Sequence, residues 1–305
     1  MTSNNTFGLL LLDKPTGFSS FRAMHHIKKQ FNLTKTGHTG TLDPLATGML
    51  PLCLGEAVKF SQYLLDSDKS YRALAKLGEK TNTGDKEGEI LERRTIPAFS
   101  VSDIERILDQ FRGTILQVPP MYSAIKYEGK RLYRWARKGY VIERPAREVQ
   151  IHQLTLVAQT EETLTLDIVC SKGTYIRTLI EDIGELLGAG AHIQALHRHY
   201  VKPFDTQKMY SLSHYKSLAP DELNAYILPM SVALSHIPVL HLGKEDAHAL
   251  SQGKKRVHSE KNISGEPVVH QLVNEETQLF IGIGTLSSDH IVSPKRMLTP
   301  QESIT

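Results

Sequence analysis

Segments with the pattern of a strand and segments with the pattern of a helix follow one another in no regular order along this sequence. Residues 7–12 form an apolar run that ends in the turn sequence DKPTG, which predicts a buried strand. Apolar residues alternate with smaller or polar ones along residues 164–170, as in a strand with one buried face. Because the steady strand–helix–strand rhythm of a parallel α/β protein is absent, the sequence predicts an α+β fold with a mixed sheet.

Three segments have the apolar spacing of amphipathic helices. Ser19 or Ser20 can cap the first, whose apolar face would consist of Phe21, Met24, Ile27 and Phe31. Ser102 and Glu105 have the spacing of a capping box for the second, whose apolar stripe would be Ile104, Ile107, Leu108 and Phe111. The third is expected after Gly173, with an apolar face of Ile176, Leu179, Ile180, Ile183 and Leu187.

The pattern changes in the last quarter of the chain. A length of 305 residues suits one large domain with a small one, or two comparable domains. Beyond His236 the apolar segments become short and glycines separate them, and VVHQLV and QLFIGIG have the pattern of two strands. We therefore expect a large domain over residues 1–236 and a small β domain over residues 237–305.

Composition excludes several classes of protein. Lys and Arg outnumber Asp and Glu by only 36 to 33, so the distribution of charge must indicate any polyanionic partner. Cys53 and Cys170 lie far apart and have no metal-ligand spacing, which favours reduced thiols and no metal site. The N-terminal apolar run is too short for a signal peptide or a membrane span, and we expect a cytoplasmic protein without a membrane partner.

One carboxylate stands alone in the segment HTGTLDPLATGML, residues 38–50. Asp43 is the only acid between Phe31 and Leu54, and the glycines and proline around it predict an irregular loop that a ligand can approach. An aspartate in such a loop often only caps a turn. The alternative is a nucleophile or general base in a pocket made partly apolar by Leu42, Leu45 and Leu50.

A buried Asp43 would need a cationic partner to stay ionised. Two residues have suitable surroundings: Arg177 in SKGTYIRTLIEDIG and Lys14 in the DKPTG turn. Arg177 would lie in the first turn of its helix, where the ordinary role is a surface ion pair. The sequence alone leaves the pairing open.

Tyr71 begins a strand in which Ala73, Ala75 and Leu77 would share its face. The ordinary interpretation is a tyrosine packed in the core with its hydroxyl bonded. The functional interpretation is a ring stacked on a base, with its phenol placed for proton transfer.

Basic and aromatic residues are enriched together in residues 121–148. The segment has eight Lys or Arg against three Glu, together with the only Trp and four of the eleven Tyr. Cations of this kind neutralise phosphates while aromatic rings stack on unpaired bases, which favours RNA binding. An amphipathic helix whose long basic side chains extend to solvent is the alternative.

Residues 38–50 resemble the central motif of the tRNA pseudouridine synthase B family, whose members act on uridine 55 in the T loop of tRNA. The resemblance extends to LLLLDKPTGFSS, KSYRALAKLGEKTNTGDKEG, QVPPMYSAIKYEGKRLYRWARKG, CSKGTYIRTLIEDIGELLG and PKRML. It implies a mixed, largely antiparallel sheet flanked by helices, followed by a small C-terminal RNA-binding domain of PUA-like type.

The resemblance implies roles by position. Asp43 matches the family's catalytic aspartate, Arg177 the arginine that pairs with it, and Tyr71 the tyrosine beside the base. Residues from about 119 to 148 match the insertion that folds over RNA. The residues implied to bind substrate or RNA are Lys14, His38, Gly40, Thr41, Lys126, Lys130, Arg131, Arg134, Trp135, Arg137 and Leu196.

The chain differs from many members of that family at two short motifs, and it differs from the guide-RNA-dependent relatives in length and tail. Where many members have two consecutive arginines, this chain has His197 and Arg198, which puts the phosphate contact at position 197 in doubt. Lys202-Pro203-Phe204 likewise stands where many have Gly-Pro-Phe. The length and the absence of a lysine-rich tail separate the chain from guide-RNA-dependent relatives, so we expect a monomer that acts without guide RNA.

The implied reaction breaks the N1–C1′ bond of uridine, turns the uracil and joins C5 to C1′. It needs no cofactor or metal, and the chain has no glycine-rich nucleotide-binding motif. Asp43 would either attack C1′ or remove a sugar proton. Two other functions remain open: a non-catalytic RNA chaperone that does not need Asp43, and a nucleoside or glycoside hydrolase, which usually needs a second carboxylate or a metal.

Overall fold

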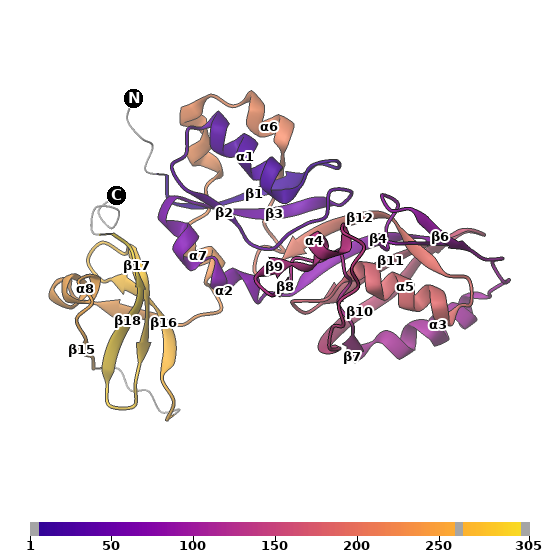
Figure 1. Cartoon of the computed structure of the whole chain (residues 1–305). Coiled ribbons are helices and arrows are strands. Elements are labelled where there is room, and N and C mark those ends of the chain that lie inside the picture. The colour runs from indigo at the N-terminus through magenta and orange to yellow at the C-terminus, as the bar shows by residue number, and fades with distance from the viewer. Residues whose placement is uncertain (1–5, 260–264, 300–305) are drawn as a thin grey trace.

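The computed structural model describes residues 6–259 and 265–299, and two sheets of different size dominate it (Figure 1). Within these residues the larger sheet has nine strands in the order β13-β1-β3-β12-β4-β11-β10-β7, with β2 paired to β3. The strands are β1 (Gly8–Lys14), β2 (Thr36–His38), β3 (Thr47–Leu54), β4 (Lys69–Leu77), β7 (Gly113–Gln117), β10 (Arg147–Gln159), β11 (Thr163–Cys170), β12 (Ala191–Val201) and β13 (Tyr210–Ser211). The β1–β13 and β3–β12 pairs are parallel and the others antiparallel, which confirms the predicted mixed, largely antiparallel sheet.

Helices and short strands flank this sheet. The helices are α1 (Ser20–Gln30), α2 (Gln62–Leu65), α3 (Val101–Leu108), α4 (Leu132–Ala136), α5 (Ile176–Leu186), α6 (Leu212–Ser217) and α7 (Met230–Ala233), with the short 3₁₀ helices η1 (Gly55–Phe60), η2 (Asp109–Phe111) and η3 (Pro220–Tyr226). Two hairpins stand apart from the sheet, β5 (Glu79–Thr81) with β6 (Ile90–Arg93), and β8 (Lys126–Tyr127) with β9 (Lys130–Arg131).

Two predicted helix caps differ in outcome. Ser19 caps α1, because its side chain accepts a hydrogen bond from the Arg22 amide, as predicted for one of the two serines. The capping box of α3 is formed by Ser100 and Asp103, so the prediction of a box between Ser102 and Glu105 was wrong. The spacing serine–x–x–acid occurs twice in this stretch, and the helix begins early enough to use the first.

The apolar face predicted for α1 is correct except at its first residue. Met24, Ile27 and Phe31 are buried, whereas the Phe21 side chain is 65% exposed and stacks on His25. The buried residues within α1 are Ser20, Ala23, Met24 and Ile27, and Phe21 is turned about 100° around the helix from Ser20. Spacing alone therefore placed it on the wrong side.

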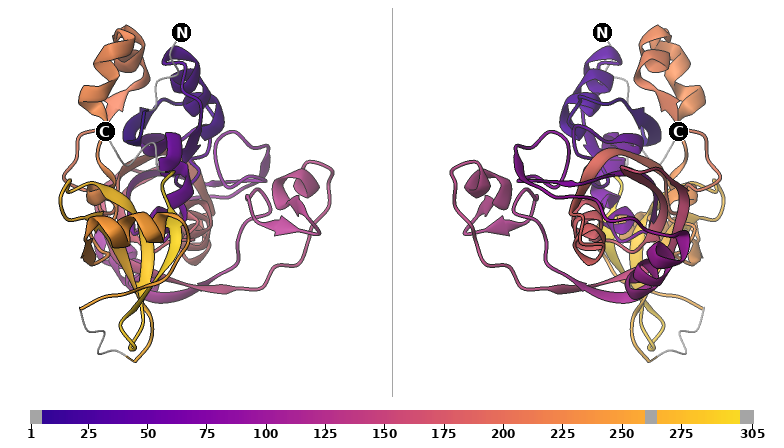
Figure 2. Two further views of the ribbon diagram at one scale, coloured as in Figure 1. Left: turned by 90° about the vertical axis from the view of Figure 1, so that its left-hand side faces the viewer. Right: turned by 90° about the vertical axis from the view of Figure 1, so that its right-hand side faces the viewer.

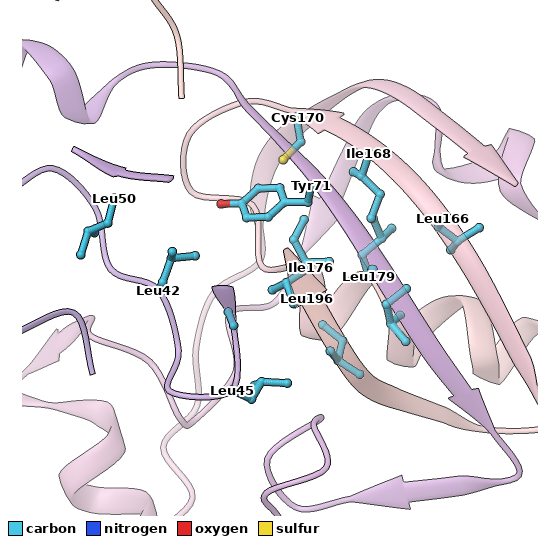
Figure 3. Close-up of a cluster of buried hydrophobic side chains, with 14 of the residues drawn as sticks. Leu42, Leu45, Leu50, Tyr71, Leu166, Ile168, Cys170, Ile176, Leu179 and Leu196 are labelled. Atoms are coloured by element: carbon cyan, nitrogen blue, oxygen red, sulfur yellow. The ribbon is translucent and has the colours of Figure 1, made fainter. Parts of the chain in front are cut away.

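The strand face that begins at Tyr71 is buried as predicted, together with Ala73, Ala75 and Leu77 of β4. Residues of β11 and α5 complete this core, and Figure 3 shows Tyr71 beside Ile176, Leu179 and Leu196. The ring of Tyr71 extends from β4 toward the segment that carries Leu42 (Figure 3). Tyr71 therefore lies at the edge of the main core.

Strand β12 occupies the centre of the larger sheet. It runs parallel to β3 and antiparallel to β4, and Arg198 of β12 lies opposite Gly48 on one side and Tyr71 on the other. This pairing joins segments about 130 to 150 residues apart in the sequence, and it brings β12 next to the loop that holds Asp43. The position of β12 decides which side chains form the floor of the site.

A second sheet of five strands follows, in the order β14-β16-β17-β18-β15, with helix α8 (Lys244–Ser251) beside it (Figure 1). Its strands are β14 (Val239–Leu242), β15 (Arg256–Val257), β16 (Val268–Asn274), β17 (Phe280–Leu286) and β18 (Ile291–Met297). The two predicted strands VVHQLV and QLFIGIG correspond to β16 and β17. Residues 260–264 and 300–305 of the expected second domain lie outside the described part.

Aromatic and ionic contacts join the second sheet to the first. Phe280 of β17 packs on Phe7 and Phe60, with ring centroids 6.5 and 5.1 Å apart. Thr299 donates a 2.8 Å hydrogen bond to the buried carboxylate of Glu56 in η1. Burial alone would raise the pKa of Glu56, but bonds from Lys59, Thr299 and Lys35 lower it to about 2.

The structure gives three findings on the cysteines, on metal sites and on membrane spans. Cys53 and Cys170 are buried and carry free thiols. In the described ranges, no three His, Cys, Asp or Glu side chains gather as ligands of a metal ion. None of the helices there has the length and apolar character needed to cross a membrane.

Candidate active site

A cleft of about 950 Å³ lies where the Asp43 loop, β4, β12 and the start of α5 meet. The loop after β5 and the insertion between β7 and β10 close its remaining sides. Eight of the residues predicted from the sequence line it: Gly40, Thr41, Asp43, Tyr71, Arg131, Arg137, Arg177 and Leu196. These residues are far apart in the sequence, and the sheet pairing brings them together.

Asp43 and Arg177 form an ion pair inside this cleft. The Nε atom of Arg177 lies 3.0 Å from Oδ2 of Asp43, and Nη2 lies 3.4 Å from Oδ1. The Arg177 side chain is only 6% exposed and the Asp43 side chain is 33% exposed. The pairing implied by the resemblance is therefore present, and the alternative of a surface ion pair for Arg177 is wrong.

The remaining hydrogen bonds of Arg177 connect three parts of the site. Nη1 donates to the carbonyl oxygen of Thr83 at 2.8 Å, and Nη2 donates to that of Tyr122 at 2.7 Å. Arg177 is the second residue of α5, as predicted, so the helix fixes the origin of its side chain. One guanidinium therefore holds Asp43, the loop after β5 and the first residues of the insertion in fixed relation.

Opposing effects act on the Asp43 carboxyl. Burial raises its pKa above the ordinary value, while the positive charge of Arg177 acts in the other direction. Asp85, which is buried nearby, also raises the pKa of Asp43 by like-charge repulsion. The result is a carboxyl with a raised pKa, poorly solvated and dependent on Arg177 for its ionised form, as a nucleophile or base in an apolar pocket requires.

Lys14 has a different position from the one expected. Its side chain is fully buried, and Nζ donates hydrogen bonds to the carbonyl oxygens of Pro15, Phe18 and Pro44 at 2.9, 2.7 and 3.3 Å. Burial lowers the pKa of Lys14 to about 8. An ammonium enclosed in this way does not meet RNA, so we reassign Lys14 as a residue that positions the Asp43 loop.

Tyr71 and Leu196 form an apolar wall of the cleft. They lie on neighbouring strands, because Leu196 of β12 pairs with Ala73, two residues along β4 from Tyr71. Burial raises the pKa of Tyr71, so its phenol stays protonated at neutral pH. The ring of Tyr71 packs in the core, as the ordinary interpretation expects, and it also lines the cleft, so stacking on a base stays a prediction.

The insertion is a small hairpin followed by a five-residue helix, α4, so the alternative of one long amphipathic helix is wrong. Figure 2 shows this segment standing away from the rest of the chain. Trp135 makes edge contacts with Tyr127 and Tyr140. In the described structure none of the segment's eight cations forms an ion pair, and six of them are exposed: Lys126, Lys130, Arg131, Arg134, Arg137 and Lys138.

Some predicted residues do not line the cleft. Lys126, Lys130, Arg134 and Trp135 belong to the outer part of the insertion, which the cleft does not reach. His38 lies in β2, and its Nδ1 is 3.2 Å from the carbonyl oxygen of Gly40, so it contacts the loop backbone. Burial lowers the pKa of His38. A neutral His38 imidazole is therefore placed to fix the conformation of the loop.

The sequence analysis missed two cations that line the cleft, Arg198 and Lys69. The sequence analysis noted Arg198 only beside His197, where many members of the family have two arginines, yet Arg198 is 1% exposed. The signal was present, because Arg198 is two residues after Leu196 and alternate residues of a strand share a face. His197 points to the other side and contacts Thr47, with Nδ1 2.8 Å from Oγ1.

Comparison with protein families gives three adjacent matches. Residues 28–176 match the TruB family pseudouridylate synthase N-terminal domain, and residues 177–235 match the tRNA pseudouridylate synthase B C-terminal domain. Residues 238–298 match a further C-terminal domain described as pseudouridine synthase II TruB. The five-stranded sheet coincides with this last match and is consistent with the expected PUA-like type.

Similar proteins cover nearly the whole chain. The tRNA pseudouridine synthase B of Marinomonas sp. (strain MWYL1) is 48% identical over 298 residues, covering 97% of this chain and 96% of that protein. The protein of the same name from Histophilus somni (strain 2336) is 46% identical over 296 residues, covering 95% and 94%.

Among solved structures, a Cbf5-Nop10-Gar1 complex contains a chain that matches with a TM-score of 0.72 and 24% identity, covering 97% of this chain and 86% of that one. At this identity the match shows the fold alone. The motifs, the fold and the relatives agree, and the chain belongs to the TruB family of pseudouridylate synthases.

Proposed function

We propose that this chain converts uridine 55 in the T loop of tRNA to pseudouridine, with Asp43 as its catalytic carboxylate. Family membership and relatives named tRNA pseudouridine synthase B support an isomerase that acts on tRNA. The observation that carries the assignment of residues is the ion pair in the cleft between the half-buried Asp43 and the buried Arg177. The position in the T loop rests on the sequence motifs.

The proposed chemistry uses groups that the cleft already holds. Asp43 either attacks C1′ or removes a sugar proton, and the N1–C1′ bond breaks with its electron pair passing to the uracil. The uracil turns and C5 bonds to C1′, while the bond between Asp43 and C1′ breaks or, on the other route, Asp43 returns the proton to the sugar. C5 then loses its proton and N1 gains one. Arg177 keeps Asp43 ionised against the effect of burial, and the Tyr71 ring and Leu196 give the base an apolar surface.

The target base must leave its stack to reach Asp43, which costs a few kcal/mol. Contacts to the RNA backbone offset this cost. The exposed cations of the insertion stand at the mouth of the cleft, with Arg131 and Arg137 lining it. We therefore assign RNA gripping to the insertion, with Lys126, Lys130, Arg134 and Trp135 on its outer part.

The same reasoning extends to domains and assembly. We propose a catalytic domain over residues 1–236 and an RNA-binding domain over residues 237–305, since the second sheet begins at Val239. We also propose that a monomer acts without guide RNA in the cytoplasm. Relatives 43–48% identical over nearly the whole chain carry the tRNA-specific name, which supports action on tRNA.

The test is to incubate the protein with an unmodified tRNA transcript and map pseudouridine by chemical labelling. We expect one product at uridine 55, and Asp43→Asn should lose it while keeping the fold and tRNA affinity. Asp167→Asn is the matched control, because Asp167 is as exposed as Asp43 and also pairs with an arginine, Arg72, but does not line the cleft. Substantial product from Asp43→Asn would end the assignment, tRNA binding without product would favour a chaperone, and free uracil would favour a hydrolase.

A further inference from the structure

The deepest cation of the cleft has no counter-charge in the structure. Arg198 is 1% exposed, and its Nε donates a 2.7 Å hydrogen bond to the carbonyl oxygen of Met49. Its Nη2 is buried and has no hydrogen-bond partner in the described residues. No carboxylate among those residues forms an ion pair with it, in contrast to Arg177. A guanidinium buried without an anion is costly, so a site that retains one is built to receive a ligand.

A second cation converges on the same point. Both Arg198 and Lys69 line the cleft, and a Cβ atom placed on Gly40 would lie 3.9 Å from Nη1 of Arg198 and 4.0 Å from Cε of Lys69. Gly40 has a φ of +86°, a conformation that leaves its backbone open on this side. The three residues therefore form one recess, with two cations and a glycine.

Like-charge repulsion acts between the two cations of the recess. Lys69 is half-buried, and burial together with the charge of Arg198 lowers its pKa to about 8. Its Nζ also donates to backbone oxygens of Leu65 and Ser67, which fixes the ammonium but does not neutralise it. A ligand with a permanent negative charge would relieve this repulsion.

We propose that Arg198, Lys69 and Gly40 form a binding subsite for one phosphodiester group next to the target uridine. The proposal rests on the proposed function, because it takes the ligand to be RNA. A phosphodiester carries its charge throughout the reaction and accepts two parallel hydrogen bonds from an arginine, while glycine leaves room for its oxygens. The uracil carries negative charge only while it is detached, so two permanently placed cations suit it less well.

This subsite differs from the cations of the insertion in position and in purpose. The insertion's cations are exposed and can grip the RNA at several places, whereas Arg198 is held rigidly by the β3–β12–β4 pairing. A phosphate fixed here would set the position of the attached ribose, and hence of C1′, relative to Asp43. The subsite would therefore position the reacting nucleotide.

The experiment compares the loss of RNA affinity when one phosphate charge, one protein cation, or both are removed. T-arm RNAs are made with a neutral methylphosphonate on either side of the target uridine, and affinity is measured with Asp43→Asn to prevent turnover. We expect one of the two to bind about tenfold to a hundredfold more weakly than unmodified RNA, as the loss of a charged hydrogen-bonded contact predicts. Arg198→Gln should show a similar loss with unmodified RNA and little further loss with that methylphosphonate.

Further variants keep the test independent of folding. Lys69→Gln should reduce the effect of the same methylphosphonate, while Arg72→Gln, on the exposed face of the same strand, should leave it unchanged. If neither methylphosphonate weakens binding to the protein with Arg198 intact, the proposal is wrong, whatever Arg198→Gln does. It is also wrong if Arg198→Gln retains the full methylphosphonate effect but slows turnover at saturating RNA, because Arg198 would then act on the uracil. If the unaltered protein forms no pseudouridine in unmodified tRNA, the proposed function is contradicted instead. The binding measurement tests the subsite separately, because it involves no turnover.

Discussion

The backbones of Gly48 and Arg198 lie so close that a Cβ atom on residue 48 would be 2.2 Å from the carbonyl oxygen of Arg198. Gly48 also has a φ of +101°, which residues with a side chain rarely adopt. This contact is where β3 and β12 pair, three residues after Leu45, the last residue of the motif's central DPL. The shape of the Asp43 loop therefore depends on a glycine that does not line the cleft.

Gly48→Ala is expected to destabilise the fold by about 3 kcal/mol or more, because it adds a clash with rigid backbone to the strain of a positive φ. The control is Gly188→Ala, which has a φ of +73° and no atom within 4 Å of the added Cβ. It should cost only the strain, about 1 kcal/mol. Urea unfolding measures both, and equal losses would show that the close approach of β12 is not rigid.

Arg177→Met is expected to remove most activity, since burial already raises the pKa of Asp43 and Arg177 is the main opposing charge. Rate should fall about tenfold for each unit by which that pKa then exceeds the assay pH. The pH–rate profile of the residual activity should shift to higher pH. Arg72→Met is the matched control, because Arg72 holds Asp167 through two 2.7 Å hydrogen bonds on the surface. Normal rates from pH 6 to 8 in Arg177→Met would contradict a role for the pair.

Much of the fold could be predicted because local patterns and tertiary structure agree. Alternation placed Tyr71 and Leu77 on the buried face of β4, and the spacing of apolar residues located α5 with Arg177 in its first turn. In both cases the residues that form the element also face one continuous core, so the local period carries the answer. Phe21 shows the limit, since its spacing from Met24 suits the buried face of α1 and yet its side chain lies beside that face and is exposed.

The site could be predicted only where a motif is contiguous. Asp43 stood out by its loop, whereas strand alternation could place Arg198 on the face of Leu196 but could not show that β12 pairs with β3 and β4 and buries it. Strand pairing across 150 residues leaves no trace in a local window. Lys14 was placed in the right motif but in the wrong role, because sequence cannot distinguish a lysine that contacts a ligand from one whose ammonium binds buried carbonyl groups.

Glu181→Gln is expected to stabilise the protein at pH 8. Burial raises the pKa of Glu181 from 4.5 to about 7, so the folded chain binds a proton there that the unfolded chain has lost. Stability therefore falls as the pH rises from about 4.5 to 7, and above that range the full free energy of ionising the buried carboxyl is lost from the folded state. The gain should be on the order of 2 kcal/mol at pH 8 after allowance for partial exposure, and should vanish near pH 4.

The matched variant is Glu185→Gln, one turn further along α5. Hydrogen bonds from Arg94 and Lys80 lower the pKa of Glu185, so its charge stabilises the folded state above the ordinary glutamate pKa. Its loss should cost less than about 1 kcal/mol, since the pair is exposed. Thermal unfolding at pH 4, 6 and 8 separates the two, and a Glu181→Gln gain that does not change with pH would show that its carboxyl is not the cause.

Replacing Lys130, Arg131, Arg134 and Arg137 with Gln is expected to weaken tRNA binding and its salt dependence together. Each phosphate neutralised contributes a slope of about −0.7 to −0.9 to log affinity against log salt, so the slope should flatten by several tenths per lost contact. Turnover at saturating RNA should change far less than in Asp43→Asn, because these side chains hold the strand and lie away from the glycosidic bond. The control replaces four cations whose charges are already paired within the protein: Arg72, Lys76, Arg93 and Arg106. That variant removes the same formal charge, so a slope that flattens equally in both would mean that net charge attracts the RNA. If the slope changes in neither, the insertion's cations face solvent in the complex as well, and the RNA-gripping role assigned to the insertion would have to be given up.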